Sequence, residues 1–129
     1  MGIISKLLSL FGSNARQQSN IADNIQQGAI VAFTDIALAK VRESQKADGR
    51  PFLRVMINQG GPGVYMYDMD FDDQVNVAED ILDLSHGIQV IVDRRSAIFL
   101  DATTIDWQRT PQGAEGFHFD NPNAVQSDG

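Results

Sequence analysis

The sequence predicts a compact, strand-rich α+β domain: a small β-sandwich or pseudo-barrel of short mixed strands with one main helix and one short helix. From Phe52 onward, apolar residues recur with a period of two in several short runs, which is the period of half-buried strands. Only two stretches after residue 28 show a convincing helical signal. The 17 acidic residues include 14 Asp, a residue that favours turns and caps over helix surfaces.

The composition limits the classes of function. A chain of 129 residues with 43% hydrophobic content is one domain in length, and its formal charge of -7 would repel nucleic-acid phosphates and anionic membranes. Nucleic acid is therefore not an expected partner. The chain has no cysteine, so it can form neither a disulfide nor a thiolate site. We expect a cytoplasmic protein.

The N-terminal 28 residues differ from the rest. Residues 1–12 are amphipathic at helical spacing but too short for a membrane span, which needs about 20 residues. They could dock to a membrane surface or a partner, lie on the domain's own core, or form a frayed terminus. The last two interpretations are favoured because the single Lys6 is a poor membrane anchor. Residues 13–28 are predicted to be a polar linker or weak helix, and residues 29–129 to form the domain.

The first half of the domain opens with a strand over residues 29–33. Thr34 and Asp35 can cap a helix that runs to about Gln45. Two alternating strands follow on either side of a glycine-rich tight turn at residues 60–63. Their inward residues are predicted from the alternation to be Leu53, Val55, Ile57, Tyr65, Tyr67, Met69 and Phe71.

The second half contains shorter elements. We predict a strand over residues 75–77, a helical or irregular piece over 78–85 and a buried strand over 88–92. Asp93 can cap a short helix that ends near Leu100. A strand at 103–108, a turn at 111–113 and a strand at 116–119 complete the domain. The aromatic residues on these last strands, Trp107, Phe117 and Phe119, are expected to belong to the core.

Three stretches carry a family resemblance: Gly60-Gly61-Pro62-Gly63-Val64, Gly116-Phe117-His118-Phe119-Asp120-Asn121-Pro122-Asn123-Ala124 and Ser127-Asp128-Gly129. Together they resemble the A-type iron-sulfur cluster carriers, the HesB/IscA-like family, over about three quarters of the chain. The resemblance implies a HesB-like fold. It also implies an iron-sulfur cluster or iron that thiolates hold between subunits and pass to apoproteins.

The ligand positions of that family are altered here. The resemblance places Pro62 at the first cysteine and Asp128 at the second, and the third falls beyond Gly129. Cluster iron is held overwhelmingly by cysteine thiolates. We therefore expect a degenerate, cysteine-less member that binds no cofactor. It would be an accessory or protein-interaction module for iron-sulfur cluster assembly. Its expected partners are other proteins, and it could also form a homo-oligomer.

Other candidate sites for metals or catalysis have less support in the sequence. A divalent-metal (iron) site could use His118, Asp120 and Asp128 across a dimer. The acidic run from Asp68 to Asp73 lacks the glycine that a calcium loop requires and fits a strand with one wet face. His118 is expected to be exposed on its strand, and no catalytic residue is predicted, so the chain is not expected to be an enzyme.

Overall fold

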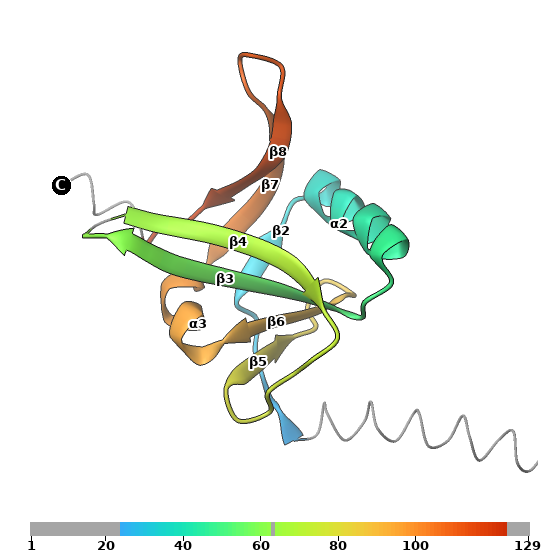
Figure 1. The fold of residues 1–129 in the computed structure, drawn as a ribbon, viewed down its shortest axis with the longest axis vertical. Coiled ribbons are helices and arrows are strands. Elements are labelled where there is room, and N and C mark those ends of the chain that lie inside the picture. The colour runs from blue at the N-terminus through green and yellow to red at the C-terminus, as the bar shows by residue number, and fades with distance from the viewer. Residues whose placement is uncertain (1–23, 63, 124–129) are drawn as a thin grey trace, which may run out of the picture.

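The computed structural model describes residues 24–62 and 64–123 as two sheets with two helices (Figure 1). It confirms the predicted strand-rich α+β class. Residues 1–12, and the linker prediction for residues 13–23, lie outside the described part of the chain. No helix among the described residues is long and apolar enough to cross a membrane.

The larger sheet has five strands in the order β1-β5-β6-β3-β4. These strands are β1 (Gln26–Gln27), β5 (Asp80–Asp83), β6 (Gln89–Asp93), β3 (Phe52–Gly61) and β4 (Val64–Asp72). β3 and β4 form the predicted antiparallel hairpin, while β6 runs parallel to β3 on its other side. Exposure alternates along β4, with Tyr65, Tyr67, Met69 and Phe71 turned inward as the sequence indicated.

The smaller sheet has the order β2-β7-β8, with β2 (Val31–Phe33) parallel to β7 (Thr103–Arg109) and β8 (Glu115–Asp120) antiparallel to it. The main helix is α2 (Asp35–Asp48) and the short helix is α3 (Arg94–Leu100). Both predicted caps are confirmed. Thr34 Oγ1 accepts the Ala37 amide at 3.3 Å and Asp93 accepts the Ser96 amide at 3.0 Å.

The main core lies between the two sheets and α2. It consists of buried aliphatic side chains from nearly every element, with the aromatic residues of β7 and β8 packed against its margin. Its fully buried members include Val41, Val55, Val90, Leu100 and Ile105. Trp107, Phe117 and Phe119 are partly buried against this cluster, in agreement with their predicted core role.

Two neighbouring segments were wrongly predicted. Residues 75–77 do not form a strand, and the segment assigned as helical or irregular contains β5. All four residues of β5 are buried, including Asp80 and Asp83, so the strand shows no alternation of apolar and polar residues. Charged residues are rarely buried without partners, which is why a run containing two Asp suggested a surface segment.

The described end of the predicted linker belongs to the sheet. Gln26–Gln27 pairs with β5, and Ile25 packs in a second small cluster with Phe52, Leu82 and Ile91. This cluster covers the side of the five-stranded sheet that the main core does not use.

Candidate functional site

The glycine-rich turn lies at the tip of the β3–β4 hairpin. Its ladder shifts register between Gln59 and Gly61, and Gly61 pairs with Val64, so the tight turn predicted between two strands is confirmed. Pro62 is exposed at this tip. A proline side chain has no donor or acceptor atom, and the tip therefore offers only backbone groups where the family resemblance places a thiolate.

Asn121, in the turn after β8, is nearly buried at 5% exposure. Its Nδ2 donates to the Phe99 carbonyl at 2.9 Å and to the Tyr67 hydroxyl at 3.2 Å, and its Oδ1 accepts the Asn123 amide at 2.9 Å. Asn123 Nδ2 in turn donates to the carbonyls of Phe99 and Asp101. The two asparagines thus satisfy carbonyls at the C-terminal end of α3, which the helix leaves without partners.

The same turn holds the hairpin against the smaller sheet. Tyr67 of β4 stacks on Phe119 of β8, with centroids 4.6 Å apart and the rings 11° from parallel. Nearer the tip, Tyr65 contacts Phe99 of α3 at 5.8 Å between centroids. The Asn121 turn, α3 and the base of the hairpin tip therefore form one packed unit.

The three residues of the predicted metal site are not all placed together. His118 and Asp120 lie two residues apart on β8, exposed on the same face as predicted for His118, whereas Asp128 lies outside the described residues. Asp106, opposite His118 on β7, shares that face. Its carboxylate accepts hydrogen bonds from Thr34 Oγ1, Gln108 and the Trp107 amide, which together lower its pKa.

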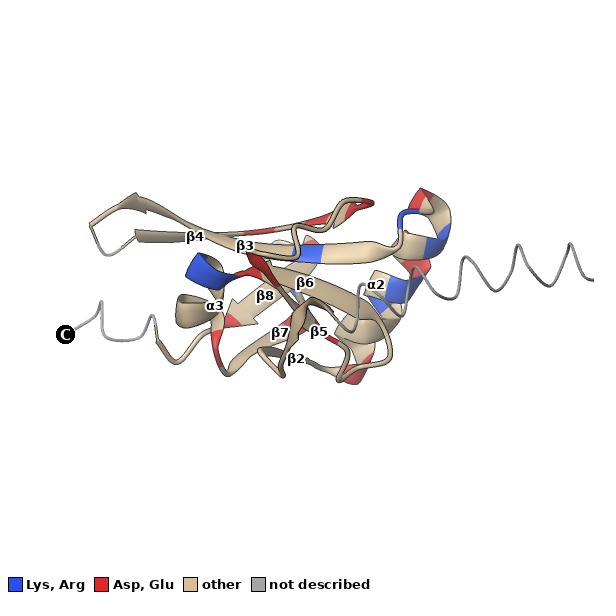
Figure 2. Cartoon of the chain, turned by 90° about the horizontal axis from the view of Figure 1, so that it is seen from below, with Lys and Arg blue, Asp and Glu red and all other residues tan. Residues whose placement is uncertain are grey.

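Metal ligands are not gathered elsewhere in the described chain. Across residues 24–62 and 64–123, no three His, Cys, Asp or Glu side chains are arranged to hold a metal ion. Asp68 and Asp70 stand on the outer face of β4, as the strand interpretation of the acidic run predicted. Figure 2 shows this acidic colour along β4, while the basic residues lie mainly on the two helices.

The sequence interpretation missed two buried carboxylates. Asp83 accepts the Ile30, Val31 and Ser85 amides and the Ser85 hydroxyl. Burial alone would raise the pKa of Asp83, but these four hydrogen bonds outweigh it and the pKa is lowered. The donors to Asp83 lie about 50 residues away or in the following loop. The only indication of buried carboxylates in the sequence was therefore an Asp at each end of an Ile-Leu pair.

Asp80 is held by an arginine. Arg54 of β3 donates two hydrogen bonds to Asp80, each 3.0 Å long, and one to Asp72 at 2.9 Å. Burial opposes ionisation of Asp80, yet the Arg54 hydrogen bonds and the Asn76 amide lower its pKa overall. This ion pair fixes β5 to the hairpin and leaves its carboxylates unavailable to a ligand.

The arrangement as a whole positions a hairpin tip and a buried asparagine turn without any strong metal donor at the tip. It can present shape, backbone groups and carboxylates to another molecule. His86 Nε2 is hydrogen-bonded to the Val31 carbonyl at 2.9 Å, and His118 is exposed on β8.

Comparison with known proteins gives a consistent assignment. The sequence profile described as "Iron-sulphur cluster biosynthesis" matches residues 29–127. The iron-sulfur cluster insertion protein ErpA of Alcanivorax borkumensis is 33% identical over 110 residues, which cover 84% of this chain and 91% of the relative. SufA of Bacillus subtilis, described as uncharacterized, is 34% identical over 101 residues, or 77% of this chain and 82% of that protein.

Solved structures share the fold. IscA with a [2Fe-2S] cluster superposes with a TM-score of 0.59 at 23% identity, covering 71% of this chain and 85% of IscA. Escherichia coli SufA gives a TM-score of 0.59 at 24% identity, with 72% and 86% coverage. At these identities the likeness supports the fold alone.

Proposed function

The chain belongs to the iron-sulfur cluster biosynthesis family of A-type carriers, and we propose that it serves cluster assembly as an accessory or protein-interaction module that binds no cluster itself. One observation carries the proposal. The Asn121 turn that supports the hairpin is complete in its hydrogen bonds, while the exposed tip carries Pro62 in a chain without a single cysteine.

Soft thiolates stabilise cluster iron, and neither proline nor a lone carboxylate replaces them. Asp128, the residue at the second thiolate position, is a hard oxygen donor. A protein of this kind would act in the cytoplasm by providing a binding surface. Its partners would be other proteins of iron-sulfur assembly or a second copy of the chain. No enzymatic step is assigned to it.

Anaerobic reconstitution with iron and sulfide tests the proposal directly. We expect the wild-type chain to remain without visible charge-transfer bands after desalting. The matched control carries Pro62→Cys and Asp128→Cys with Cys-Gly appended after Gly129, which restores thiols at all three family positions and should acquire the bands. Stoichiometric bands in the wild-type chain would overturn the proposal.

A divalent ion at His118, Asp120 and Asp128 is the second candidate. The observation in its favour is that His118 and Asp120 project from one face of β8 with both side chains exposed. A ligand that binds only the native state raises its apparent stability. Millimolar iron, manganese or zinc should then raise the melting temperature of the wild-type chain and leave that of His118→Ala unchanged, and equal melts would remove this candidate.

A further inference from the structure

Two strand edges lie open beside each other. β4 ends the five-stranded sheet and β8 ends the three-stranded sheet, and within the described residues no strand lies beyond either one. The Tyr67–Phe119 stack brings these edges together at one end. An uncovered strand edge carries unpaired backbone groups and is a template for another strand.

The register identifies which backbone groups of β4 are open. In an antiparallel ladder, the backbone polar groups of successive residues point alternately toward and away from the partner strand. The Phe71 amide donates to the Asp70 side chain at 2.8 Å, so it points away from β3. Residues of the same parity, Tyr65, Tyr67 and Met69, therefore direct their N–H and C=O groups to the open edge.

An apolar groove runs beneath this edge. Its cavity measures about 350 Å³ and lies between β4, β8 and α2. The apolar side chains that line it are Val41, Leu53, Tyr67, Met69, Phe71, Phe117 and Phe119. Ligand-binding clefts are commonly of this size and lining. A strand added at β4 would turn every second side chain into the groove.

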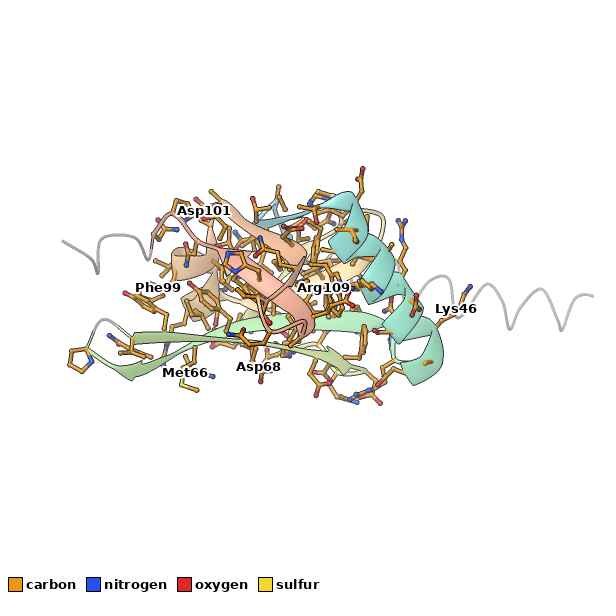
Figure 3. All side chains as sticks on the ribbon, turned by 90° about the horizontal axis from the view of Figure 1, so that it is seen from above. Lys46, Met66, Asp68, Phe99, Asp101 and Arg109 are labelled. Carbon is orange, nitrogen blue, oxygen red and sulfur yellow. The ribbon has the colours of Figure 1, made fainter. Side chains whose placement is uncertain are left out.

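The opposite face of the same edge is acidic. Asp68 and Asp70 also border the cavity, but they alternate along β4 with its apolar lining residues and both are exposed. Figure 3 shows Asp68 on the side of the hairpin turned away from β7 and β8. Asp70 has Arg50 at 3.4 Å, but Asp68 forms no ion pair within residues 24–62 and 64–123. Side chains directly opposite on neighbouring strands interact, and opposite charges there are favourable.

We propose that the open edge of β4 binds an extended segment of a partner protein that alternates apolar with basic residues. The apolar side chains enter the groove beside Met69 and Phe117, the basic side chains lie beside Asp68 and Asp70, and the backbone pairs with Tyr65, Tyr67 and Met69. The proposal rests on the interaction role proposed for this chain and names the surface and the chemistry of its partner.

Charge complementarity selects this occupant over a second copy. Two β4 edges pairing antiparallel about Asp68 or Met69 would place Asp68 opposite an acidic residue of the other chain, and like charges directly opposite are destabilising. The overall charge of -7 acts in the same direction, since it attracts a basic segment and repels another copy.

A labelled octapeptide that alternates lysine with valine probes the groove by fluorescence anisotropy with the full chain. We expect it to bind at least about tenfold more tightly than a glutamate-valine octapeptide, and Asp68→Lys to remove most of that preference. Glu43→Lys, an equal charge change on the exposed side of α2, should lower the affinity far less. Methylation of alternate peptide nitrogens along one edge should abolish binding, because it removes the donors for strand pairing.

Amide chemical shifts of the ¹⁵N-labelled chain locate the bound peptide, with the largest changes expected at Tyr67 and Met69. Shifts centred elsewhere, equal effects of Asp68→Lys and Glu43→Lys, or no binding would overturn the proposal. A dimer that forms without peptide and protects the Tyr67 and Met69 amides would also overturn it.

The reconstitution experiment tests the proposed function separately. Visible bands in the wild-type chain would overturn the cluster-free role but not the peptide-binding result. A failed peptide assay would not affect the outcome of reconstitution.

Discussion

The buried polar interior and the exposed hairpin tip respond differently to sequence change. Asp83 and Asn121 are 1% and 5% exposed and each hydrogen-bonds several groups that would otherwise lack partners. Pro62 is exposed at the tip of the hairpin, beyond the Gly61–Val64 pair that ends its ladder. We therefore expect substitution of either residue of the first pair to destabilise the fold, and substitution at the tip to be tolerated. The chain thus keeps the family's fold although it has no cysteine.

The largest expected effect comes from Asp83→Asn. The substitution places an amide nitrogen among four donors and leaves buried backbone amides unsatisfied, which should cost about 3 kcal/mol of unfolding free energy. Chemical denaturation at neutral pH measures this loss. A loss under about 1 kcal/mol would show that the buried carboxylate is not what holds β5 to β2.

The pH dependence of stability in the wild type and in Asp83→Asn tests the role of the buried carboxylate further. The folded pKa of Asp83 is lowered, so its stabilisation is fully present above the unfolded value of about 4 and is lost as the pH falls through the folded pKa. Wild-type stability should therefore fall on acidification below about pH 4 more steeply than that of Asp83→Asn. Parallel curves for the two proteins would contradict the assignment.

Asn121→Ala should cost about 2 kcal/mol, because a nearly buried side chain with three hydrogen bonds is removed. Asn123→Ala is the matched control: it removes two hydrogen bonds from an exposed side chain and should cost less than about 1 kcal/mol. Denaturant titrations of both variants give the difference. Equal losses would mean that burial of Asn121 does not distinguish the two asparagines.

Features that depend on neighbouring residues could be predicted from the sequence, whereas contacts between residues far apart in the chain could not. The alternation of β4 and the caps at Thr34 and Asp93 depend on neighbouring residues, so their patterns were visible. β5 was missed because its Asp80 is neutralised by Arg54, 26 residues earlier. For the same reason, the asparagine turn was recognised as a family feature, whereas its bond to Tyr67, 54 residues away, appears only in the folded chain.

The smallest stability effect is expected at the tip itself. Pro62→Ser and Pro62→Cys should change the free energy of unfolding by less than about 0.5 kcal/mol, since exposed substitutions away from caps and buried contacts are usually that mild. Thermal melts under reducing conditions measure both variants, with Asn121→Ala as the contrasting one. If Pro62→Ser destabilised the chain as much as Asn121→Ala, proline would be a structural requirement of the turn. The absence of a thiol there would then be explained by folding, and no longer by the loss of a ligand role.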